Sequence, residues 1–207
     1  MKKLTRKGIE AMKNEMPILS EDILRLIVAG AGYYSPTGEL LNVTAGDEGM
    51  IYILGASGYT TLSQASTSDA LSFITARAGD VFGYSGVVKI TNESGVWAGL
   101  NQNGELCINP AYLDQMNNLY DLNSLLEHEG YHLSGSSGSG SSGSINTNED
   151  DVYYNQVRTS TFAMASPAFK KATAENWYQA NLSNGNSGMP LTSYYHLCFL
   201  DANGNPL

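Results

Sequence analysis

The chain has 207 residues, 42% of them hydrophobic, which is enough for one globular domain with its own core. It carries 11 basic and 20 acidic residues, a formal net charge of -9, and no cluster of Lys or Arg forms a stripe that could offset this charge, so nucleic acid is excluded as an expected partner. The longest apolar run, residues 23–31, contains Arg25 and is far shorter than the roughly 20 residues of a transmembrane helix. No transmembrane segment is expected.

The acidic residues are concentrated in one third of the chain. Residues 90–157 contain 9 acidic and 0 basic residues, whereas the segments on either side are nearly balanced. Such a run is most often a solvated face of a protein. The alternative is that the segment surrounds a cation, and the motifs within it favour this second interpretation.

Residues 1–32 are expected to form a separate N-terminal segment. Five basic residues and one acidic residue lie among the first 13, and Ser20 is a plausible N-cap for the apolar stretch that ends in the small residues 29–32. This order resembles the charged leaders, ending in paired small residues, that some bacterial transporters trim during export. The resemblance implies export or secretion by a non-classical leader rather than a cytoplasmic location. An ordinary N-terminal helix is the alternative.

The first half of the remaining chain has the pattern of short strands. Turn chemistry at residues 35–38 and 101–104 separates β-rich apolar runs, which together predict a small, mostly antiparallel twisted sheet. A short helix is predicted over residues 66–78. The β-rich runs are residues 50–54, 87–90, 96–100 and 106–108.

The second half is predicted to be mainly helical. Asn109 followed by Pro110 is typical of a helix start, and Ser166-Pro167 separates the last two helices. The eleven residues 134–144 are all Ser or Gly and predict a flexible connector, either a natural loop or an engineered replacement. We therefore expect an α+β fold, with residues 33–207 as one domain. The predicted helices are residues 110–118, 122–133, 149–164 and 168–181.

The predicted helix 122–133 contains the motif His128-Glu129-Gly130-Tyr131-His132. The four-residue spacing places both imidazoles on one helix face about one turn apart, where they can bind one metal ion, and zinc suits such ligands. Glu129 then lies near the open coordination position, where a carboxylate can take a proton from water and pass it to a leaving amine. The alternative is two ordinary histidines, but the surrounding leucines predict a buried helix in which unpartnered polar groups are costly.

This motif resembles that of the zinc metallopeptidases called zincins, and the likeness covers about residues 85–165. The resemblance implies a strand edge, then the motif helix, then a second element that supplies the third ligand. In one branch, the metzincins, a Gly and a further His follow the motif. Gly135 falls in the right place, but Gly138 occupies the His position, which excludes that branch. The gluzincin branch takes a Glu from a later helix, and Glu149 is the matching candidate.

The segment from Glu149 to Gln156 resembles the Glu-x-Asp-Ala-Tyr-x-x-Gln helix of several bacterial secreted and toxin-associated metallopeptidases, in which the leading Glu binds zinc. The resemblance implies Glu149 as the third ligand. Asp150 and Asp151 are near enough to compete, and Glu149 could instead cap the helix after Asn146. A neighbouring carboxylate often accepts the second imidazole N–H of a ligand histidine, and we expect Asp151 to do so.

Two further roles are predicted. His196 is the leading candidate for a donor that stabilises an oxyanion across the cleft, with Tyr153 and Tyr154 behind it, although a lone His is more often structural. Residues 96–100 have the composition of the edge strand along which zincins bind peptide as an added strand. An ordinary core strand is the alternative for this segment.

The sequence thus predicts zinc-dependent hydrolysis of a peptide bond in a protein or peptide substrate. His128, His132 and Glu149 are the expected ligands, and Glu129 is the expected general base. The surrounding acidic residues should favour cationic or neutral substrates. Two other hypotheses remain: an exported effector or toxin that uses the same peptidase chemistry, and a zinc-stabilised binding module without turnover. The sequence does not indicate an oligomeric state.

Overall fold

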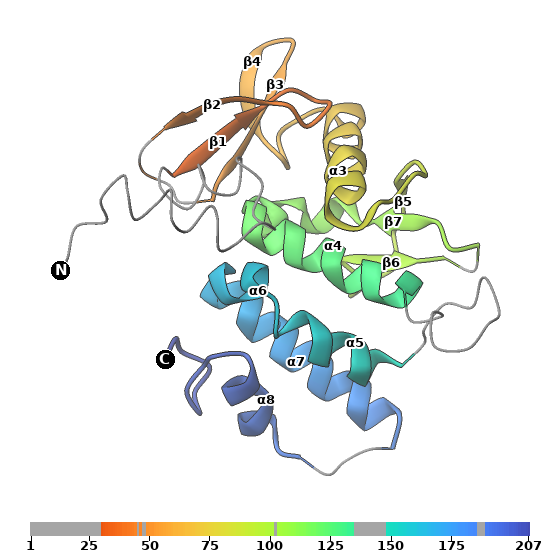
Figure 1. The fold of residues 1–207 in the computed structure, drawn as a ribbon, viewed down its shortest axis with the longest axis vertical. Coiled ribbons are helices and arrows are strands. Elements are labelled where there is room, and N and C mark those ends of the chain that lie inside the picture. The colour runs from red at the N-terminus through yellow and green to blue at the C-terminus, as the bar shows by residue number, and fades with distance from the viewer. Residues whose placement is uncertain (1–29, 45, 47–48, 102, 135–147, 186–188) are drawn as a thin grey trace, which may run out of the picture.

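The computed structural model describes residues 30–44, 46, 49–101, 103–134, 148–185 and 189–207. Over these residues, two small mixed sheets are followed by a mostly helical C-terminal half, which confirms the α+β class (Figure 1). No helix in these ranges is long and apolar enough to cross a membrane. The leader-like residues 1–29 and the connector residues 135–144 lie outside the described residues, so their expected roles stay predictions.

The first sheet has four strands in the order β2-β1-β3-β4. The central strands β1 and β3 run parallel, and each outer strand pairs antiparallel with its neighbour. Side chains alternate across the sheet, so that Ile51 and Ile53 of β3 are fully buried. Because β1 begins at Ala31, the last two residues of the predicted N-terminal segment belong to this sheet. The strands are β1 (Ala31–Tyr34), β2 (Leu40–Thr44), β3 (Ile51–Gly55) and β4 (Gly58–Thr61).

Helix α3 (Thr67–Phe82) lies between the two sheets in the chain. The Ser66 hydroxyl accepts a hydrogen bond from the Asp69 amide and caps its start, and Gly83 in the left-handed conformation ends it. The second sheet has the order β5-β7-β6, with β5 parallel and β6 antiparallel to β7. The single, mostly antiparallel sheet predicted from the sequence is therefore two mixed sheets. The second sheet consists of β5 (Lys89–Ile90), β6 (Ala98–Leu100) and β7 (Leu106–Ile108).

The helical half begins with a 3-10 helix, η1, where an α-helix was predicted. The helix predicted over residues 149–164 is broken in two, because the Thr159 side chain accepts a hydrogen bond from the Phe162 amide and caps a new helix. A short C-terminal helix, α8, follows α7. These elements are η1 (Pro110–Met116), α4 (Leu119–Ser134), α5 (Glu149–Gln156), α6 (Ser160–Met164), α7 (Pro167–Ser183) and α8 (Leu191–Leu197).

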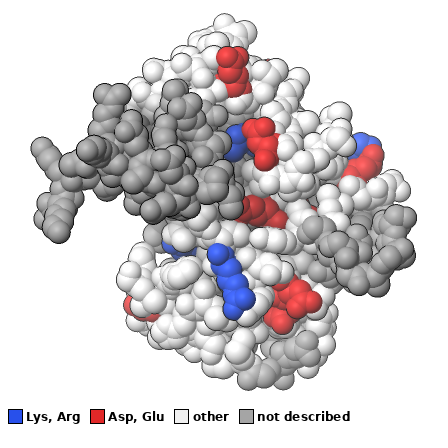
Figure 2. Space-filling model, viewed as in Figure 1, with Lys and Arg blue, Asp and Glu red and all other residues white. Residues whose placement is uncertain are grey.

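Helix α4 occupies the centre of the molecule. It packs against α3 and β6, and on its other side against α5 and α6 (Figure 1). Leu122 and Leu126 are fully buried in the main core. Cys107 and Cys198 are both free thiols, so no bridge connects the second sheet to the C-terminal region. On the face drawn in Figure 2, Lys and Arg side chains lie apart and form no continuous basic strip.

Candidate metal centre

One face of α4 lines a cavity of about 470 Å³. The side chains that face it are Leu125, His128, Glu129 and His132. His128 and Glu129 are neighbours, and each lies three or four residues from Leu125 and from His132, so the four form a single stripe along the helix. The helical period predicted from the sequence therefore places both motif histidines and the motif glutamate on the same wall.

The three predicted ligands come together in this cavity. One ligand atom from each of His128, His132 and Glu149 lies within 4.8 Å of the others. The two histidine Nε2 atoms are 3.2 Å apart, and each is 3.4 Å from an oxygen of the Glu149 carboxylate. Both imidazoles are buried, and Glu149 enters from the first turn of α5. This group can hold a metal ion.

Gln156 determines which nitrogen of His128 faces the group. Its Nε2 donates to the carbonyl oxygen of Ser124 at 3.0 Å, and because a carbonyl can only accept, the amide orientation is fixed. The Gln156 Oε1 atom then lies 3.2 Å from His128 Nδ1 and accepts its N–H. In the neutral imidazole, Nε2 therefore carries the lone pair that a metal requires.

Asp151 does not have the role predicted for it. Its side chain is exposed and accepts a hydrogen bond from Asn148 Nδ2 at 2.7 Å, away from the imidazoles. Asp150 also points elsewhere, since its carboxylate accepts from Trp177 Nε1 at 2.6 Å and Asn181 Nδ2 at 2.9 Å on α7. Of the three neighbouring carboxylates, only Glu149 belongs to the metal-binding group.

Glu129 is a buried carboxylate in the cavity wall. It is 2% exposed, and its buried Oε2 atom has no hydrogen-bond partner among the described residues. Burial raises the pKa of Glu129, against the opposing effect of the two histidines. A buried carboxylate oxygen without a partner is costly, which distinguishes Glu129 from the paired carboxylate of Glu149 in the same cavity.

The ligand side chains also shift one another's pKa. Burial alone would lower the pKa of His128, but the hydrogen bond to Glu149 and the charges of Glu129 and Glu149 raise it above its usual value. Burial alone would raise the pKa of Glu149, but the hydrogen bond and charge of His128 lower it. Without a metal, the group thus favours an imidazolium–carboxylate pair.

His196 is not brought to the site. It lies on α8 with an exposed side chain and is absent from the cavity wall. Of the two alternatives, Tyr154 is 43% exposed and lies under the Arg158 guanidinium, 3.7 Å from the ring centre, outside the cavity. Tyr153 does line the cavity, with its ring 4.5 Å from that of His128. Of the three donors predicted from the sequence, Tyr153 is therefore the one that the structure places at the cavity.

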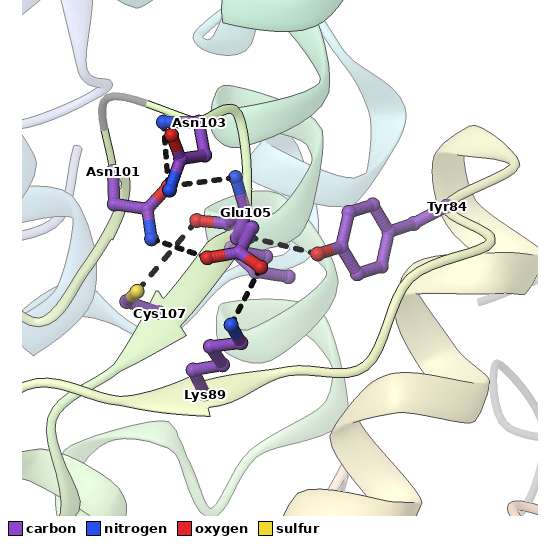
Figure 3. A network of polar contacts seen from close by, with 7 residues as sticks. Tyr84, Lys89, Asn101, Asn103, Glu105 and Cys107 are labelled. Carbon is purple, nitrogen blue, oxygen red and sulfur yellow. Dashed lines mark hydrogen bonds and ion pairs between the residues drawn. The ribbon is translucent and has the colours of Figure 1, made fainter.

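Strand β6 forms the wall beside the helix stripe and lies at the edge of its sheet. Its hairpin with β7 is fixed by Glu105, which binds Lys89 of β5 at 2.5 Å and Asn101 at 2.7 Å (Figure 3). Tyr84 also holds β7, because its hydroxyl accepts a hydrogen bond from the Leu106 amide at 2.9 Å. The strand predicted over residues 96–100 is thus present over residues 98–100, at the edge of its sheet, and these contacts hold it in place.

Helix α7 forms a wall of the cavity that the sequence did not predict. Its contributing residues, Phe169, Thr173, Asn176 and Ala180, are spaced by three or four and form one face of the helix. This periodicity was visible in the sequence, but nothing local indicated that this face would meet the motif helix.

Comparisons with protein-family models, with curated proteins and with solved structures gave no match. The functional interpretation therefore rests on the residues and the geometry of the cavity.

Proposed function

We propose that this protein is a zinc-dependent metallopeptidase that hydrolyses peptide bonds at the cavity formed by α4, α5, α7 and β6. The observation that carries the proposal is the position of Glu129: this buried glutamate, whose Oε2 has no hydrogen-bond partner among the described residues, lines the same cavity as two histidines and a glutamate that can hold a metal. In a site that only stabilised the fold, a buried and unpartnered carboxylate beside the ligands would reduce stability without serving a function.

The donor set suits zinc. Two neutral imidazoles and one carboxylate are the ligands of many catalytic zinc sites, and they leave a position open for water or substrate. His128, His132 and Glu149 would hold the ion, with Gln156 fixing the tautomer of His128. The chemistry that zinc supplies at such a site is polarisation of a carbonyl and activation of water.

Glu129 acts as the general base and then as the general acid. Its raised pKa makes its carboxylate a better proton acceptor than an exposed Glu, and the proton that it takes from water is later donated to the leaving amine. Tyr153 donates a hydrogen bond to the oxyanion that develops at the attacked carbonyl. Burial raises the pKa of its hydroxyl, so it stays protonated at neutral pH.

Strand β6 binds the substrate backbone. The Asn109 amide donates to the Trp97 carbonyl, and the Asn101 amide donates to the Glu105 carbonyl. Along a strand of an antiparallel pair, every second residue directs its N–H and C=O groups to the partner strand, and the residues between direct theirs away from it. Trp97 and Asn101 bond to the residues at either end of β7, so Ala98 and Leu100 direct their backbone groups to the free edge of the sheet. A peptide can pair with this edge as an added strand and lie across the helix stripe.

The substitution Glu129→Gln tests the proposal. It keeps the size of the side chain but replaces the carboxylate by an amide, which cannot act as a base, so zinc content should be unchanged while peptide cleavage falls by about 10²- to 10⁴-fold. Zinc content is measured by elemental analysis and cleavage by mass spectrometry of a peptide mixture. Zinc binding without any cleavage by the wild type would instead support the zinc-stabilised binding module. Action as an exported effector or toxin stays a prediction from residues 1–32.

A further inference from the structure

The cavity extends beyond the metal-binding group toward the start of α4. Leu125 lies on the same helix face as Glu129, one turn earlier, and also lines the cavity. The stripe on α4 is therefore polar at its C-terminal end, where His132 meets Glu149, and apolar at its N-terminal end.

Helix α7 is anchored at this same end. The Asp121 carboxylate, in the first turn of α4, accepts hydrogen bonds from the Ser166 amide and the Ser166 hydroxyl, each at 2.7 Å. Ser166 is the N-cap of α7, so the two helices start side by side. Phe169 and Leu125, which follow these anchors by three and four residues, consequently reach the same end of the cavity.

The segment that leads into β6 completes this end. The Trp97 ring lies 5.8 Å from the Phe169 ring, measured between centroids, and Trp97 also lines the cavity. Leu125, Phe169 and Trp97 thus come from three different elements and form what we call the apolar recess. Among the described residues that line the whole cavity, none is Lys or Arg.

We propose that the apolar recess receives one bulky apolar side chain of the substrate, at a position next to the cleaved bond. The inference rests on the proposed peptidase function. A peptide paired with β6 runs past Trp97, so one of its side chains meets the recess while its backbone crosses Glu129. An anionic side chain there would lose its water without gaining a basic partner, whereas an apolar one gains by burial against Leu125, Phe169 and Trp97.

A cleavage profile of the zinc-loaded protein tests the inference. A mixture of peptides with all side chains is digested, and the cut sites are read by mass spectrometry. Phe, Leu, Met or Tyr should be enriched at a single position flanking the cut. Cleavage without such a preference would overturn the inference and leave the proposed function intact. The absence of any cleavage would overturn the proposed function and the inference with it.

Two leucines of α4 offer a matched pair of variants. Leu125→Ala enlarges the recess, so the ratio of kcat/KM for a Phe substrate to that for a Leu substrate should rise by about tenfold. Leu126→Ala removes the same atoms from the core but does not touch the cavity, and should leave the ratio unchanged. An equal change in both variants, or none in either, would contradict the inference.

Binding without turnover gives an independent readout that needs only the Glu129→Gln protein. Calorimetric titration with two peptides that differ only at the flanking position, Phe against Ala, should give a Kd about tenfold or more lower for the Phe peptide. Equal Kd values would overturn the inference even if Leu125→Ala fails to fold.

Discussion

Gln156 illustrates how one side chain organises the metal centre. The sequence predicts a carboxylate, Asp151, as the partner of a ligand histidine. An amide does more at this position, because it accepts from His128 Nδ1 and donates to the Ser124 carbonyl of α4. A carboxylate has no proton with which to make the second bond. The Gln was part of the motif that the segment resembles, but its role needed the contact between α5 and α4.

This geometry predicts opposite results for two neighbouring substitutions. Gln156→Ala frees the His128 imidazole to rotate or to change tautomer, so zinc affinity should fall by about 10- to 100-fold. Asp151→Asn should leave the affinity unchanged, because Asp151 contacts Asn148 rather than the group. Competition with a chelator of known affinity measures both. A loss confined to Asp151→Asn would restore the expectation from the sequence.

The metal-free protein should show a distinct pH dependence of stability. The pKa of His128 is raised in the folded state, so its stabilising contribution is complete below its ordinary value of 6.5 and is lost as pH rises through the folded pKa. The pKa of Glu149 is lowered, so its contribution is present above its ordinary value of 4.5 and is lost as pH falls through the folded pKa. The two contributions therefore overlap fully between these values.

Urea unfolding of the chelated protein across this pH range measures the effect. The difference in unfolding free energy between the wild type and Glu149→Gln should be largest between pH 4.5 and 6.5. Zinc requires neutral His128, so zinc affinity should rise with pH and binding should release a proton. A stability difference that is independent of pH would contradict the ion pair.

At the scale of elements, Gly130 allows the motif helix to approach α3. A Cβ atom built on Gly130 would lie 2.7 Å from Phe82 Cβ and 2.9 Å from Phe82 Cγ. These atoms stand close to the backbone of α3 and cannot swing away. The absence of a side chain at the third position of the motif is thus a packing requirement of the pair α3 and α4.

Two Gly→Ala substitutions in helices should therefore have different effects on the free energy of unfolding. Gly130→Ala gains helix propensity but forces α3 and α4 apart, with a net loss of about 1–3 kcal/mol in unfolding free energy. In Gly79→Ala, the nearest atom outside the helix is the Tyr84 carbonyl oxygen at 3.4 Å, so stability should be unchanged or rise by up to about 1 kcal/mol. Chemical denaturation measures both, and equal effects would contradict the close packing at Gly130.

Local patterns predicted the elements better than their arrangement. The apolar runs at residues 50–54 and 106–108 and the Asn109-Pro110 start correspond to β3, β7 and η1. The division into two sheets was not predictable in this way, since a strand pattern does not identify its partner strands. The break after α5 depends on the Thr159 cap, which lies inside an otherwise continuous helical pattern.

At the scale of the molecule, the acidic third of the chain has several separate functions. Glu129 and Glu149 belong to the cavity, Asp121 anchors α7, and Glu105 fixes the β6 hairpin. Glu93 also lines the cavity, and the bias toward cationic or neutral substrates stays a prediction. Three of these five carboxylates thus line a cavity that could hold a cation, as the uneven charge suggested, and the other two position elements around it.

Helix periodicity and a motif predicted which residues come together in the candidate site, whereas the meeting of distant elements was not predictable from local patterns. His128 and His132 share a face by spacing alone, and Glu149 joins them as the resemblance implied. His196 lies outside the cavity wall, and nothing in its local sequence determines where α8 packs. The apolar recess depends on contacts among α4, α7 and the segment before β6, which no local pattern encodes.

The metal content of the purified protein tests the central claim most directly. Elemental analysis after exposure to zinc and removal of the excess should give one zinc per chain for the wild type and for His196→Ala, whose side chain lies outside the cavity. His132→Ala removes a ligand and should bind less than a tenth as tightly. A wild type that holds no zinc, or an unchanged zinc content in His132→Ala, would contradict a metal centre at His128, His132 and Glu149.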